Sequence, residues 1–148
     1  MKNRIPPPIV LLFFGLCIFL SRNLLPMLSV DFFFYIGLGC ELVGIGIIFS
    51  CIRSFRKHET SLNPLKPDTA SALVVEGMYG FSRNPMYLGL AFILVGVSFQ
   101  LNIIGGMIFL PLFVLYLNIF QIIPEEKAML ELFRDEFDEY KNRVRRWI

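Results

Sequence analysis

Residues 85–123 read PMYLGLAFILVGVSFQLNIIGGMIFLPLFVLYLNIFQII and contain no charged side chain. A helix needs about 20 apolar residues to cross the hydrocarbon core of a membrane, so this stretch is long enough for two crossings. The residues 100–102 (QLN) in its middle leave room only for a tight turn. We therefore expect two membrane-spanning helices, at about 85–99 and 103–123, that pack as an antiparallel hairpin.

Two more apolar segments lie upstream, at about 6–21 and 32–52, and only Glu41 interrupts the second. Lys2 and Arg4 precede the first segment, which is also a pattern of secretory signals, but no small-residue cleavage pattern follows it. We therefore expect this segment to be retained as a span. Together with the hairpin, the sequence predicts an all-α integral membrane protein with four transmembrane helices.

The composition argues against a soluble domain. Of the 148 residues, 55% are hydrophobic and 18% are charged, whereas soluble domains have about 45–50% and about 25%. Disordered chains are poor in aromatic residues, which make up 15% of this one. A nucleic-acid-binding protein would need a basic face on a polar domain. We expect a single membrane domain over residues 1–148.

The basic residues predict the orientation in the membrane. Of the 14 Lys and Arg residues, all but Arg22 lie before the first span, between the second and third, or after the fourth. Cytoplasmic segments of membrane proteins carry such an excess. We therefore expect both termini, the loop 53–84 and the tail 124–148 to be cytoplasmic. The membrane would be the plasma membrane in a prokaryote and the endoplasmic reticulum in a eukaryote.

The two polar segments differ in pattern. The loop contains Pro64, Pro67, Gly77 and Gly80, so we expect no long helix in it and predict that it packs at the membrane surface. In the tail, Pro124 suits a helix start, and two glutamates follow at the positive end of the helix dipole. An apolar stripe then recurs at helical spacing: Met129, Phe133, Phe137, Tyr140 and Val144. By itself this stripe predicts an amphipathic helix on the bilayer surface.

The sequence offers no metal site. His58 is the only histidine, which excludes a multi-histidine site. Cys17, Cys40 and Cys51 lie in apolar segments without a CxxC pair, where cysteine is usually a small buried side chain. A P-loop, a GxGxxG motif and a nucleophile elbow are also absent from the sequence.

The segment LVVEGMYGFSRNPMYLG, residues 73–89, carries the most specific pattern. It resembles the signature of the integral-membrane methyltransferases, which include isoprenylcysteine carboxyl methyltransferases and phospholipid N-methyltransferases. In that family the signature is followed by two spans and a Glu-Glu pair, here Glu125 and Glu126. The aromatic stripe of the tail also matches, and the resemblance extends from Asn63, in an NPLKP segment, to Arg146.

The resemblance implies S-adenosylmethionine as methyl donor, held at the cytosolic face under the tail helix, and a lipophilic acceptor that enters from the bilayer. Carried over position by position, it implies cofactor-binding roles for Leu73, Val74, Tyr79, Asn84, Pro85, Met86, Tyr87 and Glu125. Arg83 and Glu126 are the implied catalytic residues, and Gln121 and Glu41 the candidate substrate-binding residues.

The chemistry of methyl transfer suits these residue types. The reaction is an in-line displacement, which needs alignment and exclusion of water more than covalent help. Glu125 can pair with the donor's ammonium group, and Arg83 with its carboxylate or with an acidic acceptor. The rings of Tyr79 and Tyr87 can face the sulfonium, a cation–π contact worth about 0.5–2 kcal/mol. Without the motif, these residues would be read as interfacial aromatics, a positive anchor and a helix start.

Two positions depart from the family pattern. Asn84 stands where many relatives have His, so a base is missing there; this suits a carboxylate or thiolate acceptor better than an ammonium. Gln121 stands where eukaryotic isoprenylcysteine enzymes have a substrate-binding Arg. Glu41 lies within the second span, and such a residue either contacts the acceptor or is protonated and bonded to a neighbouring helix.

Three functions remain open at this stage. A methyltransferase acting on a prenylcysteine-like carboxylate or another small amphiphile ranks first. A phospholipid N-methyltransferase of the phosphatidylethanolamine type ranks second. A small non-enzymatic transport or assembly protein is the alternative of another class. The sequence leaves the acceptor and the oligomeric state open.

Overall fold

The computed structural model describes residues 5–28, 30–57 and 73–148. The loop residues 58–72, which include His58 and the NPLKP segment, lie outside the described residues. Every regular element in the described ranges is helical. In chain order the elements are α1 (Pro7–Ser21), α2 (Asp31–Lys57), η2 (Gly77–Gly80), α3 (Pro85–Leu101), α4 (Ile103–Leu117), η3 (Asn118–Ile122) and α5 (Ile123–Arg143).

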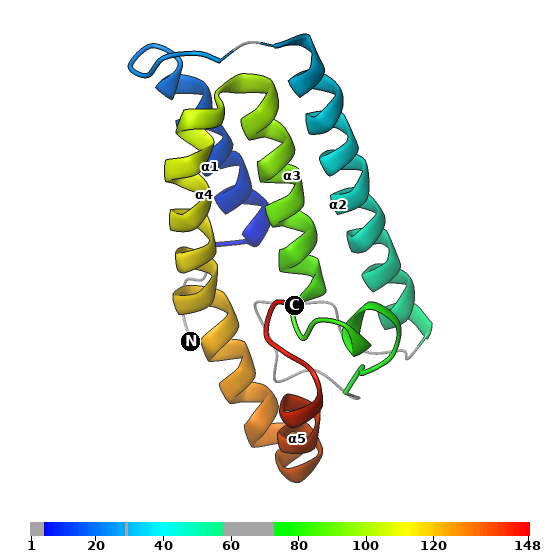
Figure 1. Ribbon diagram of the computed structural model, residues 1–148. Coiled ribbons are helices and arrows are strands. Elements are labelled where there is room, and N and C mark those ends of the chain that lie inside the picture. Colours follow the sequence, from blue (N-terminus) through cyan, green and yellow to red (C-terminus); the bar gives the residue numbers. More distant parts are fainter. Residues whose placement is uncertain (1–4, 29, 58–72) are drawn as a thin grey trace.

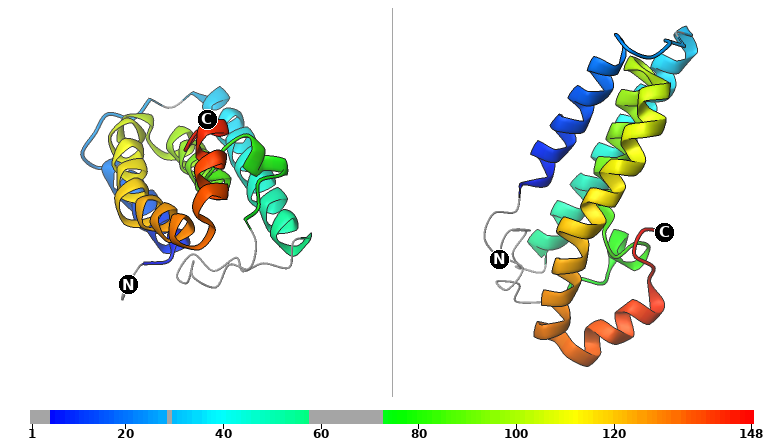
Figure 2. Two further views of the ribbon diagram at one scale, coloured as in Figure 1. Left: turned by 90° about the horizontal axis from the view of Figure 1, so that it is seen from below. Right: turned by 90° about the vertical axis from the view of Figure 1, so that its left-hand side faces the viewer.

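The helices α1 to α4 lie side by side as an elongated bundle, and α5 extends beyond one end of it (Figures 1 and 2). The all-α prediction is confirmed, with α2 longer at its C-terminal end than the expected 32–52. Two helices are long and apolar enough to cross a membrane: α2, and the continuous helical stretch Ile103–Arg143. The helices α1 and α3 are apolar but shorter.

The predicted hairpin is present, and its turn is tighter than expected. Only Asn102 separates α3 from α4. Its side-chain oxygen Oδ1 accepts hydrogen bonds from the backbone N–H groups of Ile104 (3.0 Å) and Gly105 (3.1 Å). Asn102 therefore caps α4 and satisfies two of the donors that a helix start leaves unpaired.

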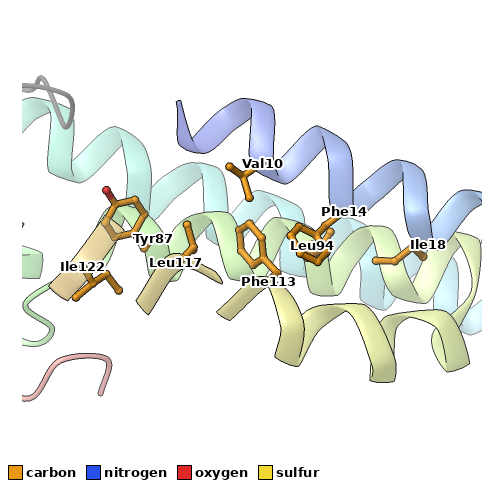
Figure 3. Close-up of a cluster of buried hydrophobic side chains, with 8 residues drawn as sticks. All are labelled: Val10, Phe14, Ile18, Tyr87, Leu94, Phe113, Leu117 and Ile122. Atoms are coloured by element: carbon orange, nitrogen blue, oxygen red, sulfur yellow. The ribbon is translucent and has the colours of Figure 1, made fainter. Parts of the chain in front are cut away.

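The main core lies between α1, α3 and α4. It consists of side chains at helical spacing that bury their apolar surface against one another: Val10, Phe14, Ile18, Tyr87, Leu94, Phe113, Leu117 and Ile122 (Figure 3). The rings of Phe14 and Phe113 meet edge to face at a centroid distance of 5.6 Å. This core fixes the end of α3 that carries Tyr87 against the end of α4.

Glycines bring α2 and α3 into backbone contact. A Cβ atom built on Gly44 would lie 2.5 Å from the carbonyl oxygen of Gly89, and one on Gly37 would lie 2.7 Å from that of Gly96. No side chain fits at these crossings. Small residues are the usual means of close helix packing in membranes, since lipid supplies no hydrophobic force between helices.

The helix α5 begins at Ile123, one residue before the expected start at Pro124, but it is not a separate helix. The chain stays helical from α4 through η3 into α5, and η3 is a π-helical turn in which the N–H of Ile123 bonds the carbonyl of Asn118, five residues back. Proline lacks an N–H and clashes with the carbonyl four residues before it, and a π-turn is a common way to absorb such a disturbance. The break comes later, at Arg134, whose φ of 41° and ψ of −113° bend α5 sharply.

Candidate functional site

The segment before α3 forms a compact corner. Gly77 has a φ of +62°, which glycine adopts without strain, and opens the short helix η2. The chain then turns through Ser82, Arg83 and Asn84, which we call the corner. The hydroxyl of Ser82 accepts a hydrogen bond from the backbone N–H of Asn84 (3.1 Å), and Pro85 begins α3. Proline suits a first helical position, because no N–H is needed there.

The last residues of the chain run back to this corner. After α5 the backbone becomes extended at Val144, and residues 144–148 form a segment that we call the strap. The N–H of Arg83 donates to the carbonyl of Arg145 (3.0 Å), and the amide of Asn84 donates to the carbonyl of Arg146 (3.1 Å). The strap therefore lies beside the start of α3, as both side views show (Figures 1 and 2).

The strap is also tied to the junction of α4 and α5. The indole N–H of Trp147 donates to the side-chain oxygen of Asn118 in η3 (3.2 Å). Each residue from Val144 to Trp147 thus makes at least one hydrogen bond to the corner, to η3 or to α5. The two sequence segments singled out before, the corner and the glutamate pair, are joined by this strap.

Glu126 is held between two arginines. One of its carboxylate oxygens accepts from Arg83 Nη2 (2.9 Å), and the other accepts from Arg146 Nη2 (2.6 Å). Arg146 Nε also donates to Glu126, at 3.1 Å. The hydrogen bond to Glu126 raises the pKa of Arg146, so the guanidinium is charged. We call these three side chains the Glu126 cluster.

Arg83 has a second set of partners. Its Nη1 atom donates to the carbonyls of Lys141 and Val144, both at 3.0 Å, at the end of α5. Its side chain is only 12% exposed. The Nε atom of Arg83 is buried and has no acceptor among the described residues. A positive side chain at a helix C-terminus is favourable, because the last carbonyls are otherwise unpaired.

Glu125 has a different environment from its neighbour. The hydroxyl of Tyr87 on α3 donates to its carboxylate at 2.6 Å. Two tyrosines lie deeper: the hydroxyl of Tyr140 donates to the carbonyl of Tyr79 (2.6 Å). Burial raises the pKa of both Tyr79 and Tyr140 above the usual range for tyrosine, so their hydroxyl groups stay protonated near neutral pH. The hydrogen bond between Tyr140 and Tyr79 fixes α5 to η2, just before the corner.

The remaining predicted cofactor residues line the same region. Val74 and Tyr79 are buried together with Cys51 of α2, and Met86 packs against them. Leu73 packs against the apolar stripe of the tail, whose innermost side chains are Phe137, Tyr140 and Val144. The apolar stripe is present as predicted. Its side chains pack against other residues of the protein, whereas the pattern by itself predicted the bilayer surface.

The contacts given for the two predicted substrate residues are to parts of the chain other than the corner. Gln121 is fully buried, and its Nε2 atom donates to the carbonyl of Ile5, just before α1 (2.8 Å). Its Oε1 atom has no donor among the described residues. Glu41 packs against Gly96, where a built Cβ would lie 2.6 Å from Glu41 Cγ. Gly96 follows Tyr87 by nine residues, which is roughly 13 Å along α3.

The sequence did not reveal Ser82, Arg146 or Trp147 as parts of this site. Arg146 and Trp147 belong to the basic C-terminal group, which by pattern suits an anionic membrane surface. Their contacts span many positions, such as Arg146 to Asn84, and no periodicity of the chain signals them.

Comparisons with known proteins show which sequences this chain is similar to. The sequence profile described as phospholipid methyltransferase matches residues 32–136. The protein-S-isoprenylcysteine O-methyltransferase of Saccharomyces cerevisiae is 35% identical over 115 residues, which cover 72% of this chain and 46% of that protein. This chain therefore spans about half the length of the yeast relative. An uncharacterized protein of Haemophilus influenzae is 38% identical over 63 residues, 43% of this chain and all of that protein. No solved structure matches significantly.

Proposed function

This chain belongs to the phospholipid methyltransferase family, and from that premise we propose that it transfers a methyl group from S-adenosylmethionine to a lipophilic acceptor at the cytosolic face of a membrane. The observation that carries the proposal is that the corner and the start of α3 meet the glutamate pair of α5. These segments are about 40 residues apart in sequence, and the 2.9 Å contact of Arg83 with Glu126 and the 2.6 Å contact of Tyr87 with Glu125 join them.

The residues fit the charges of this donor. S-adenosylmethionine supplies the methyl group, carried on a sulfonium, and also bears an ammonium and a carboxylate. Glu125 has the charge to bind the ammonium, and the ring of Tyr87 beside it suits a cation. The buried Nε of Arg83, which has no acceptor among the described residues, can be satisfied by an anionic oxygen. Leu73, Val74, Tyr79, Pro85 and Met86 would provide an apolar wall for the nucleoside.

The contribution of the protein is positioning. The described residues of the corner and the tail hold one another by charge-assisted hydrogen bonds, so the reacting groups would be aligned and shielded from water. Such positioning can supply about 7–11 kcal/mol of the barrier at best. Glu126 accepts hydrogen bonds from two arginines with both oxygens, so its carboxylate is engaged within the protein. Its role, and that of Arg83, would then be to assemble the site.

The residue at position 84 bears on the acceptor. Asn84 cannot remove a proton, so an acceptor that is already ionised, such as a carboxylate or thiolate, is favoured. The proposal is therefore closest to a carboxyl O-methyltransferase that acts on isoprenylcysteine, and the yeast relative is a protein-S-isoprenylcysteine O-methyltransferase. Phospholipid N-methylation is the second candidate. It is favoured by Gln121 Oε1, a buried acceptor without a partner among the described residues that could receive an N–H.

The same proposal places the chain in a membrane as one domain with four spans. The outer faces of α1, α2 and α4 expose large apolar side chains, among them Leu12, Phe13, Leu42, Phe49 and Leu112. Contiguous apolar surface of this kind is foreign to soluble monomers. With the bias of basic residues, both termini and the corner would lie on the cytosolic side. Glu41, at the crossing of α2 and α3, would face the acceptor from within the membrane.

The test is methyl transfer itself. Membrane extracts are incubated with the purified protein and S-adenosylmethionine labelled in its methyl group, and the labelled product is identified by mass spectrometry. We expect a labelled lipid or lipidated molecule, and loss of labelling with Glu125→Ala. Glu131→Ala, an exposed glutamate of the same helix, is the matched control. Label in no product, or equal labelling by Glu125→Ala and wild type, would contradict the proposal.

A further inference from the structure

The Glu126 cluster carries an uncompensated positive charge. It consists of two guanidinium groups and one carboxylate, so its net charge is positive by one unit. Glu125, the next residue on α5, accepts a hydrogen bond from the hydroxyl of Tyr87 and supplies a carboxylate next to the cluster in sequence. Consecutive Cα atoms are about 3.8 Å apart. The negative Glu125 and the positive Glu126 cluster are therefore attached at consecutive residues of α5.

An α-amino acid group, in which an ammonium and a carboxylate are attached to the same carbon, needs one negative and one positive partner. The amino acid end of the proposed methyl donor is such a group. In the proposed function, the carboxylate of Glu125 binds the ammonium group. The question is which arginine of the cluster is available to the carboxylate.

Arg83 is largely committed to the protein. An arginine side chain has five N–H donors. Those of Arg83 reach Glu126 and the carbonyls of Lys141 and Val144, and the side chain is 12% exposed. Its Nε has no acceptor among the described residues but is buried, so Arg83 is less open to a ligand than Arg146.

Arg146 is available. It uses Nε and one N–H of Nη2 for Glu126, which leaves both N–H groups of Nη1 and one of Nη2 without a partner among the described residues. Its side chain is 38% exposed, so a ligand can reach it. Because both Nε and Nη2 of Arg146 donate to Glu126, the guanidinium plane is held in one orientation. A planar, oriented guanidinium is the usual partner of a carboxylate.

We infer that Arg146 binds the carboxylate of the donor's amino acid group, while Glu125 binds its ammonium and Glu126 holds Arg146 in place. This inference rests on the proposed function. It makes the strap a wall of the donor site, because the backbone carbonyl of Arg146 also orients the amide of Asn84 (3.1 Å).

The experiment compares two ligands by calorimetry. S-adenosylhomocysteine has both charged groups, and S-adenosyl-3-thiopropylamine is the same molecule without the carboxylate. With Arg146→Gln, which can still donate to Glu126, we expect affinity for S-adenosylhomocysteine to fall about 10- to 100-fold, the loss of a charge-assisted pair. Affinity for the decarboxylated ligand should stay within about twofold of wild type. Arg146→Lys keeps the positive charge but loses the planar pair of N–H donors. Its affinity for S-adenosylhomocysteine should lie between those of wild type and Arg146→Gln.

The control is Lys127→Gln, which removes an exposed positive charge next to Glu126 in sequence. It should bind both ligands as wild type does. Because the two ligands are compared within each variant, a loss of folded protein cancels from the ratio. Equal losses for both ligands would show that Arg146 only holds the strap, and an unchanged affinity for S-adenosylhomocysteine would show that it has no role; either result overturns the inference. Failure of the wild type to bind either ligand would instead refute the proposed function.

Discussion

Glu125 and Glu126 are neighbours with different surroundings, and their difference explains how one motif can serve two purposes. Glu126 is neutralised by Arg83 and Arg146, whereas Glu125 receives a neutral hydroxyl from Tyr87. On the sequence alone both glutamates were placed at a helix start. The resemblance gives the two glutamates different roles, but the contacts that distinguish them could not be predicted, because they involve residues 20, 38 and 43 positions away.

Removing the hydroxyl that orients Glu125 should weaken donor binding. Tyr87→Phe deletes the 2.6 Å hydrogen bond to Glu125 and keeps the ring in the core. Hydrogen bonds to charged groups contribute about 1.5–3 kcal/mol, so we expect the affinity for S-adenosylhomocysteine to fall at least about 10-fold by calorimetry. Tyr35→Phe, at an exposed tyrosine of α2, is the control and should have no effect. Wild-type affinity in Tyr87→Phe would mean that the orientation of Glu125 is irrelevant.

Removing the charge of Glu126 should destabilise the fold of the tail. Glu126→Gln leaves Arg83 and Arg146 without their shared counter-ion, and Arg83 is largely shielded from water. We expect a loss of about 1–3 kcal/mol in the free energy of unfolding, seen as a lower thermal midpoint in detergent. Glu131→Gln, exposed on the same helix, should leave the midpoint unchanged. An equal midpoint for Glu126→Gln and wild type would refute a stabilising role of the cluster.

At the scale of elements, apolar runs and the QLN turn sufficed to predict the helices α1 to α4 and the hairpin. They did not predict the continuous helix from α4 into α5. Pro124 looks like a helix start because proline usually ends what precedes it. The π-turn Asn118–Ile122 removes that conflict, and only the backbone geometry reveals it. The bend at Arg134 is equally hidden, since an arginine rarely adopts a positive φ.

Two glycines on different faces of α2 should respond to alanine with opposite changes in the thermal midpoint. Gly44 faces α3, and a Cβ there would lie 2.5 Å from the carbonyl oxygen of Gly89. Gly46 has nothing within 4 Å of a built Cβ. We expect Gly44→Ala to separate α2 from α3 and lower the thermal midpoint. Gly46→Ala should raise it slightly, because alanine is about 0.5–1 kcal/mol better than glycine within a helix. The same direction of change for both variants would contradict the packing described.

For the whole molecule, the bundle serves to bring a corner and a tail together at one of its ends. Composition predicted the helices of the bundle, because long apolar segments suffice to indicate them. Composition does not predict which loop residues meet the tail, because the strap reaches the corner after the sharp bend at Arg134. The family signature supplied that link for Asn84 and Glu125, and gave no hint of Arg146 or Trp147.

The predicted topology can be tested by labelling. The native cysteines Cys17, Cys40 and Cys51 are first replaced by alanine or serine, and single cysteines are then introduced at Asn23, between α1 and α2, or at Lys127 on α5. A membrane-impermeant thiol reagent applied to intact cells should label only the position-23 variant. Labelling only in the position-127 variant would reverse the orientation, and labelling at both positions would contradict four spans.

The most direct test of the central claim is calorimetric titration of S-adenosylhomocysteine into wild type, Asn84→Ala and Glu125→Ala. Asn84 belongs to the corner and Glu125 to the tail, and the claim is that both segments build one donor site. We predict a one-site isotherm for wild type and an affinity at least about 10-fold weaker for each variant. Wild-type binding by either variant would mean that the donor is not held between the two segments.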